Sequence, residues 1–255
     1  MVIVRIVVIA SHPDDEMIGM AVFLSSLRSP CQIIHITDGA PRSGNDARNA
    51  GCATWQEYAA LRLQEFKRAL AFTEISADTV CLECPDQRAA WHIAEHASRL
   101  AKLFDRGDDP IVFTHPYEGG HPDHDATAAA VHAAARVSKR QPMLFEFASY
   151  HAGVRGMECE CFLGRNADPI TSPLLSAEQR AWKRNVLNLF ESQNRVLNQF
   201  PLQYEPLRAA PLYDFSHPPH AGNLYYEGFD WGLDASQWRT LASRAFQDLG
   251  ISCVC

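Results

Sequence analysis

The sequence predicts an α/β fold in which helices cover both faces of a mainly parallel, doubly wound sheet. Two observations lead to this prediction. Apolar runs rich in Val and Ile alternate with helix-forming stretches four times between residues 1 and 150. Such runs are typical of strands buried on both faces, as strands of parallel sheets are. Their alternation with helices favours a parallel sheet with a helix layer on each side.

The first strand is the apolar run from Val2 to Ile9, which only Arg5 interrupts. The later elements follow as repeated strand–helix units. We expect further strands at residues 31–37, 78–83, 111–114 and 143–147. We expect helices at residues 17–27, 55–72, 89–104 and 123–137, the last of them rich in Ala, a strong helix former. Residues 40–54 are small and polar, and we interpret them as a mobile loop of a length that often carries function.

The pattern changes after Tyr150. Residues 151–175 predict an irregular insertion with room for a hairpin, and residues 201–234 are rich in Pro, Gly and aromatic residues. Long amphipathic helices are expected at residues 178–197 and 236–249. The apolar face of the first of these comprises Ala181, Trp182, Val186, Leu189 and Phe190. Without a repeat or linker in the sequence, we expect one domain over residues 1–255, with a core of about 1–150 and a pocket-covering extension of about 151–255.

Composition excludes some classes of function. Apolar residues make up 47% of the 255-residue chain and charged residues 21%, as in ordinary globular proteins. A net charge of −7 argues against general binding to nucleic acid or anionic membranes. The sequence has no apolar stretch long enough to span a bilayer. It also has no basic stretch before its first apolar run, as a signal peptide would, so we expect a cytoplasmic protein.

The eight cysteines give only a weak signal. A zinc ribbon needs two properly spaced pairs of cysteines. The chain has a single C-x-x-C, at residues 81–84, and C-x-C pairs at residues 159–161 and 253–255. We therefore expect free thiols, with a structural metal site or a disulfide as the alternatives.

An acidic motif follows the first strand. It contains His12, Asp14, Asp15 and Glu16 within five residues. Three carboxylates at one strand end repel each other, and a bound cation would remove that repulsion. The alternative is a helix start, with Ser11 or Asp14 as N-cap and acidic residues at the positive helix end. Both interpretations can hold together.

A second motif, residues 115–125, follows the fourth strand. The first and fourth strands of a doubly wound sheet often lie side by side where the winding reverses, and ligands bind in the crevice there. We therefore expect the two motifs to face each other. His12, Asp15 and His124 would then offer two imidazoles and one carboxylate, which leave a coordination position open as catalytic zinc sites do.

The remaining polar residues of the two motifs suggest a hydrolase. Asp14 could accept the proton of a water held by the metal, and His121 could act on the carbonyl as acid or oxyanion partner. Asp123 would hold the His121 ring. These roles predict hydrolysis of an amide or an ester.

Together, His12-Pro13-Asp14-Asp15-Glu16 and His121-Pro122-Asp123-His124 resemble the PIG-L/LmbE family of zinc-dependent N-deacetylases. The resemblance covers about residues 2–150. Members remove acetyl groups from N-acetylglucosamine-containing molecules, including thiol-cofactor precursors, glycopeptide and aminoglycoside intermediates, and glycosylphosphatidylinositol precursors.

The resemblance implies a Rossmann-like fold and Zn²⁺ on His12, Asp15 and His124. The sequence itself leaves Fe²⁺ and Co²⁺ as alternatives to Zn²⁺ in the cell. It also implies Asp14 as general base and His121 as acid or electrophilic partner, tuned by Asp123. The implied substrate is an N-acetylated sugar or glycoside, and the chain could form a homo-oligomer.

The resemblance also concerns the substrate pocket. The family has an Arg followed by a Glu where this chain has Arg62 and Glu65, and that Arg helps to hold the sugar; a surface ion pair is the alternative. Some relatives place a Tyr where this chain has Gly119, so either Tyr117 substitutes as an oxyanion donor or the oxyanion is held without a tyrosine.

Weaker signals come from single residues. Asp38 could touch the substrate, or it could simply end a strand. His217 and His220 lie in the aromatic C-terminal segment and could line the pocket, where sugars stack on aromatic rings. We expect His35 to be a buried structural residue, and we expect the pair His92 and His96 to lie on a solvated helix face. Ser192-Gln193 resembles a family feature near the pocket, with exposed polar residues as the alternative.

Other classes of function stay open at this point. A non-haem iron oxygenase also uses two His and a carboxylate, but its usual all-β barrel disagrees with the strand–helix alternation. A sugar-binding protein without activity and an amidase that acts on a non-sugar conjugate would both keep the same fold.

Overall fold

A six-stranded sheet forms the centre of the protein, in the order β3-β2-β1-β4-β5-β8. The computed structural model describes residues 5–163, 171 and 173–255. The five parallel strands are β1 (Ile6–Ala10), β2 (Cys31–Pro41), β3 (Ala77–Asp86), β4 (Ile111–Thr114) and β5 (Met143–Phe147). The edge strand β8 (Leu207–Ala209) runs antiparallel to β5. The predicted parallel, doubly wound sheet is confirmed, although residues 2–4 of the predicted first strand lie outside the described residues.

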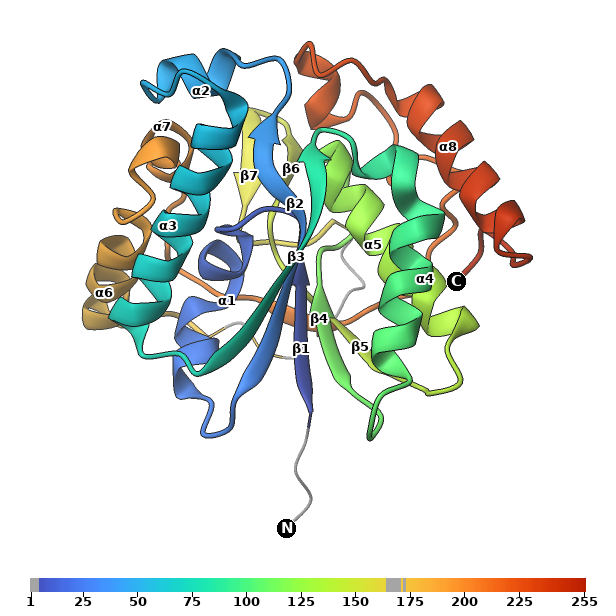
Figure 1. Ribbon diagram of the computed structural model, residues 1–255, viewed down its shortest axis with the longest axis horizontal. Coiled ribbons are helices and arrows are strands. Elements are labelled where there is room, and N and C mark those ends of the chain that lie inside the picture. The colour runs from blue at the N-terminus through green and yellow to red at the C-terminus, as the bar shows by residue number, and fades with distance from the viewer. Residues whose placement is uncertain (1–4, 164–170, 172) are drawn as a thin grey trace.

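Helices cover both faces of this sheet (Figure 1). On one side lie α1 (Asp15–Ser26), α3 (Trp55–Thr73) and α6 (Ala177–Leu187), and on the other lie α4 (Ile93–Phe104), α5 (Pro122–Val137) and α8 (Ala235–Asp248). Side chains of β1 alternate between the two cores: Val7 and Ile9 belong to one, Val8 and Ala10 to the other. This alternation follows from the two-residue period of a strand and makes β1 apolar throughout.

The winding of the sheet reverses between β1 and β4. Residues 6–8 of β1 pair in parallel with residues 111–113 of β4, while its other edge pairs with β2. The chain segments that follow β1 and β4 therefore meet at the carboxyl edge of the sheet, as the sequence predicted.

Two predicted elements differ from the structure. The predicted mobile loop, residues 40–54, contains the end of β2 and the short helix α2 (Asn45–Asn49). The predicted helix over residues 178–197 ends at Leu187 and is followed by the short 3-10 helix η2 (Glu191–Gln193) and the short α-helix α7 (Asn194–Leu197). The break has a tertiary cause, because the buried Glu65 carboxylate accepts bonds from the Ser192 amide (2.8 Å) and hydroxyl (2.6 Å).

Helix α1 also bends, at Met20, whose backbone is not helical. The amides of Val22 and Phe23 donate to the Glu205 carboxylate instead of an intrahelical carbonyl (3.0 Å each). Glu205 pairs with the fully buried Lys183 at 2.7 Å, so the carboxylate that caps the second half of α1 is neutralised.

The C-terminal third is less regular. The predicted hairpin is present as β6 (Tyr150–Gly153) and β7 (Gly156–Cys159), while residues 164–170 and 172 of that insertion lie outside the described residues. Short turns η1 (Ala89–His92) and η3 (Tyr225–Gly228) precede α4 and α8. The helices among the described residues are all too short or too polar to cross a membrane.

Candidate active site

The segment after β1 is held tightly to α5. The Ser11 hydroxyl donates to the Asp123 carbonyl (2.9 Å) and lies 2.7 Å from the Thr127 hydroxyl. The Thr37 amide donates to the Ser11 carbonyl at 2.9 Å. Asp14 occupies the N-cap position of α1 but makes no capping bond with its side chain, so this carboxylate serves another purpose.

Two imidazoles and a carboxylate meet where the two motifs face each other. The Nδ1 atom of His12 lies 3.2 Å from Asp15 Oδ2, and the Nε2 atom of His124 lies 3.2 Å from Asp15 Oδ1. Two ligand atoms on one tetrahedral zinc ion are about 3.3 Å apart, given bond lengths of about 2.0–2.1 Å. All three residues are buried. Asp15 thus lies between the two imidazoles with one oxygen towards each, and each of the two pairs has the spacing of ligands on one small divalent cation.

Further donors surround these three, and we call the whole set the His/Asp cluster. Three overlapping groups have ligand atoms within 4.8 Å of one another: His12, His121 and His124; His12, Asp86, His121 and Asp123; and Asp15, His115 and His124. Within the described residues, the buried Nδ1 atom of His124 has no partner. The donor set fits a divalent transition metal, which prefers imidazole and carboxylate ligands.

The charges within the cluster are complementary. Burial opposes protonation of His12, but Asp86 and Asp15 outweigh it and hold the pKa of this imidazole well above its usual value. Burial would raise the pKa of Asp15, but His124, His115 and His12 hold it well below its usual value. Burial lowers the pKa of His124 to about 4. The last two groups are thus in the carboxylate and neutral imidazole forms that bind metals.

Asp14 is held by Arg62. The Arg62 Nη2 atom donates to Asp14 Oδ2 at 3.0 Å, and its Nη1 atom donates to the Gly39 carbonyl at 3.0 Å. Burial raises the pKa of Asp14 to about 6, and the Arg62 charge opposes that rise. The side chains of Arg62 and Glu65 are both buried, and the Glu65 carboxylate accepts a hydrogen bond from Ser192. The alternative of a surface ion pair between Arg62 and Glu65 is therefore wrong.

Ser192-Gln193 lies close to this arrangement. The Gln193 side-chain amide donates to the Tyr58 hydroxyl at 2.6 Å, and Tyr58 lies one helical turn before Arg62 on α3. Ser192 and Gln193 are therefore half-buried and bonded to α3, and they are not an exposed polar pair.

His121 is oriented differently from the sequence expectation. The Asp123 backbone amide donates to His121 Nδ1 at 3.1 Å, so the neutral ring carries its proton on Nε2. Burial lowers the pKa of His121 to about 3. The Asp123 carboxylate instead accepts hydrogen bonds from the amides of Gln87 (2.6 Å) and Ala89 (3.0 Å), which follow β3.

Three residues of the site were not assigned a role from the sequence. Asp86 ends β3, and its Oδ1 atom lies 3.1 Å from His12 Nε2. His115 follows β4; its ring stacks on His124 at 4.0 Å, and its Nε2 atom lies 3.2 Å from Asp15 Oδ2. Tyr150 begins β6, and its ring packs edge-on against His124 at 5.3 Å. The sequence signal for His115 was its position at a predicted strand end, whereas Asp86 lay beyond the predicted end of the third strand and Tyr150 offered no signal.

Four expected pocket residues lie elsewhere. Asp38 pairs with Arg42 at 2.7 Å. Tyr117 is buried in the core against Trp238, and its hydroxyl donates to the His217 carbonyl at 2.8 Å, so it cannot replace an oxyanion donor. The exposed His217 side chain pairs with Asp214, and the Nδ1 atom of His220 bonds the carbonyl of its neighbour Ala221. None of these four contacts the described His/Asp cluster.

The C-terminal segment reaches the cluster through a different aromatic residue. The ring of Trp231 packs on His121 at 4.5 Å, and Phe229 stacks on Trp231 at 4.5 Å. Of the remaining histidines, His35 is buried and bonds Glu16 at 3.0 Å. Exposed His92 pairs with Glu95 (3.2 Å), whereas His96 is buried, so the predicted solvated face holds only for His92.

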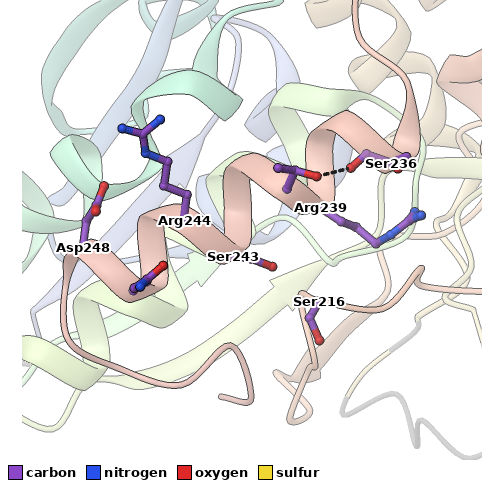
Figure 2. Close-up of a pocket in the computed structure, with 8 residues that line it drawn as sticks. Ser216, Ser236, Arg239, Ser243, Arg244 and Asp248 are labelled. Carbon is purple, nitrogen blue, oxygen red and sulfur yellow. Dashed lines mark hydrogen bonds between the residues drawn. The ribbon is translucent and has the colours of Figure 1, made fainter.

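A surface hollow beside α8 is separate from this site. Figure 2 shows Ser, Arg and Asp side chains of this lining along α8, and Ser216 on a neighbouring loop. It is lined by Ser216, Ser236, Arg239, Thr240, Ser243, Arg244, Gln247 and Asp248. None of these residues belongs to the His/Asp cluster.

Comparison with known proteins gives one family. The family model described as PIG-L, GlcNAc-PI de-N-acetylase, matches residues 7–135, about half of the chain. A comparison with curated protein sequences finds no match.

Solved structures share the fold. The chain is similar to a zinc-inhibited form of a teicoplanin deacetylase at 15% identity and a TM-score of 0.59, over 80% of this chain and 96% of that one. A pseudoaglycone deacetylase is 19% identical with a TM-score of 0.57, over 78% and 86%. A 4-carboxy-2-hydroxymuconate hydratase from Pseudomonas putida is 13% identical with a TM-score of 0.50, over 87% and 99%. Because one of these is a hydratase, the fold alone does not determine the reaction.

Proposed function

Because the chain belongs to the PIG-L family of GlcNAc-PI de-N-acetylases, we propose that it removes an acetyl group from the nitrogen of an N-acetylated sugar or glycoside. One observation carries this proposal. His12, Asp15, His121 and His124, which follow two neighbouring strands, belong to one buried cluster of overlapping donor groups, and Asp14, next to Asp15 in the chain, is buried too. The reaction uses water and yields acetate and the free amine.

His12, Asp15 and His124 are the residues that would hold a divalent metal, with Asp86 and His115 beside them. When bound, the metal would supply Lewis-acid chemistry towards water and the amide carbonyl. The zinc-inhibited form of a similar deacetylase supports a divalent metal without identifying the one used here. Zn²⁺, Fe²⁺ and Co²⁺ all accept these ligands.

Asp14 is the general base in this proposal. It takes the proton of the attacking water and passes it to the leaving amine as the C–N bond breaks. Arg62 uses Nη2 to hold Asp14 and Nη1 to hold the Gly39 carbonyl, so it positions the base instead of binding the sugar.

His121 donates its Nε2 proton to the oxygen that becomes negative when water attacks. The Asp123 amide holds the other ring nitrogen and so determines which nitrogen is protonated. The neutral imidazole acts here as a preorganised hydrogen-bond donor, and removing one such donor lowers kcat by about 10²–10³.

Tyr150 is the second donor to this oxygen. Position 119, where some relatives carry a Tyr, has no room for a side chain: its backbone is left-handed (φ +70°), and a Cβ would lie 2.7 Å from Leu224 Cδ2. At the next position, a Cβ on Gly120 would lie 2.0 Å from the Tyr150 carbonyl oxygen. Gly120 therefore lets β6 approach, and β6 brings Tyr150 to His124.

The sugar is proposed to lie against Trp231, which packs on His121, and its neighbour Phe229. Aromatic faces suit sugar rings, which present C–H groups on one side. This wall comes from the C-terminal extension, and it supports the idea that the extension covers the pocket.

Release of acetate tests the proposal. Metal-loaded protein is incubated with N-acetylated sugars, glycosides and non-sugar N-acetyl amides, with chelated protein and the Asp14→Asn variant as controls. We expect chelator-sensitive acetate from a sugar substrate and none from the variant. Acetate only from non-sugar amides would favour the amidase alternative. No acetate from metal-bound, folded protein would favour a sugar-binding protein without activity.

A further inference from the structure

The β6–β7 hairpin carries a second group of metal-binding side chains, outside the His/Asp cluster. His151 lies on β6, Glu158 on β7, and Cys161 two residues after β7. One ligand atom from each lies within 4.8 Å of the others. We propose that these three side chains bind a second transition-metal cation of the zinc type, with water at the fourth position. Figure 1 shows the two strands, in yellow, near the carboxyl ends of the parallel strands.

The hairpin places the three side chains on one face. His151 and Glu158 are directly paired across the antiparallel strands, so their side chains point the same way. Their neighbours Tyr150, Met157 and Cys159 pack on the opposite face against the core. Since Cys159 faces the core, strand alternation would turn Cys161 inward as well. The left-handed backbone of Glu160 (φ +58°) breaks that alternation, and the Cys161 Sγ atom lies 3.6 Å from His151 Nε2.

A glycine makes room for the carboxylate. The Glu158 side chain lies across Gly153, where a Cβ would stand 2.2 Å from Glu158 Cγ and 2.3 Å from its Oε1 atom. A side chain at position 153 would therefore push the carboxylate away from His151. This close approach explains the glycine at the end of β6.

The protonation of His151 suits a ligand. Its Nδ1 atom lies 3.0 Å from the Ala152 carbonyl oxygen, which can only accept, so Nδ1 carries the proton. The Nε2 lone pair then points to the side of the thiol. A backbone carbonyl on the other ring nitrogen is the usual support of a metal-binding histidine.

The distance between the sulfur and the nitrogen matches a shared ion. Zinc binds sulfur at about 2.3 Å and imidazole nitrogen at about 2.0–2.1 Å, so a tetrahedral angle separates the two atoms by about 3.6 Å. The distance in the hairpin is 3.6 Å. A thiolate and an imidazole select zinc-like ions over calcium and magnesium, which prefer oxygen. A hydrogen bond from the thiol to the ring is the simpler alternative.

Metal binding here would hold the hairpin together. A two-stranded hairpin is marginally stable by itself, and ions that join its strands add their binding energy to folding. Because β6 begins with Tyr150, the ion would also steady the ring that packs on His124. Only this last consequence rests on the proposed function; the site itself does not.

Cobalt distinguishes the two sites in the wild-type chain. The His/Asp cluster is built from imidazoles and carboxylates, so only the hairpin site adds a thiolate-to-cobalt charge-transfer band in the near ultraviolet. We expect apo protein titrated with Co²⁺ to bind two equivalents and to show this band. One equivalent without the band would overturn the proposal and leave the His/Asp cluster intact.

Variants assign the band. Cys161→Ser should remove one metal equivalent and the band, and His151→Ala should lose the same equivalent. The matched control is Cys159→Ser, on the opposite face of β7, which should keep both. His124→Ala should lose one equivalent but keep the band. Equal loss in the Cys159 and Cys161 variants, with both folded by circular dichroism, would contradict the assignment.

Discussion

The proposed role of Tyr150 can be separated from that of Tyr117 by removing one hydroxyl at a time. Tyr150→Phe keeps the ring, whose aromatic neighbours are His124 at 5.3 Å, Tyr225 at 5.6 Å and Phe200 at 6.1 Å. The unfolding free energy should therefore stay within about 0.5 kcal/mol of wild type. Loss of a donor to the developing oxyanion should lower kcat by about 10²–10³, or about 3–4 kcal/mol in the barrier.

Tyr117→Phe should have the opposite pattern. Its hydroxyl donates to the His217 carbonyl, and the ring lies in the core against Trp238. Losing that hydrogen bond should cost about 0.5–1.5 kcal/mol of stability and leave kcat near wild type. The assay is initial-rate release of acetate by metal-loaded protein, together with urea unfolding of both variants.

The two variants decide between the residues. If Tyr150→Phe kept kcat within threefold of wild type, or if Tyr117→Phe lost activity instead, the assignment of the second donor would be refuted. Metal content measured on the same samples excludes an indirect effect through His124.

Three further predictions concern packing, charge and pH. Gly120→Ala should displace β6 and lower activity at least tenfold, because its Cβ would meet the Tyr150 carbonyl oxygen. The control Gly228→Ala, which has open space around the new Cβ, should keep its activity. The rate of acetate release is measured for both variants. Lys183→Met should cost about 3–5 kcal/mol in urea unfolding, because Glu205 is left buried and unpaired, and the added change Glu205→Gln should restore part of it. Burial lowers the pKa of His132 to about 4. The unfolded chain binds a proton on His132 below about pH 6.5, whereas the folded chain does so only near pH 4, so the free energy of unfolding should fall between these two values. The fall between pH 7 and 4.5 should be smaller by about 2–3 kcal/mol in His132→Leu. An unchanged pH dependence in that variant would contradict the neutral, buried state of His132.

The parts of the fold that sequence could predict are those governed by local periodicity. Strands β4 and β5 have the expected bounds, because each is a short apolar run buried on both faces. The neighbouring positions of β1 and β4 followed from the winding of a parallel sheet. These two facts were enough to bring His12 and His124 together.

The parts that sequence missed depend on tertiary contacts. Asp86 was overlooked because the expected third strand stopped at Glu83, whereas β3 continues past register irregularities to reach the cluster. Tyr150 was overlooked because its direction depends on the close approach of β6 to Gly120. Tyr117 was misplaced, because its neighbours in the sequence are site residues but its ring packs into the core.

The role of Asp14 as the base of a metal-dependent deacetylase is tested most directly by comparing wild type with Asp14→Asn. Both proteins are loaded with Zn²⁺ or Co²⁺, their metal content is measured, and acetate release is followed on the N-acetylated sugar that wild type turns over. The account predicts equal metal content, chelator-sensitive acetate from wild type and none from the variant. A variant that holds metal and releases acetate at the wild-type rate would contradict it.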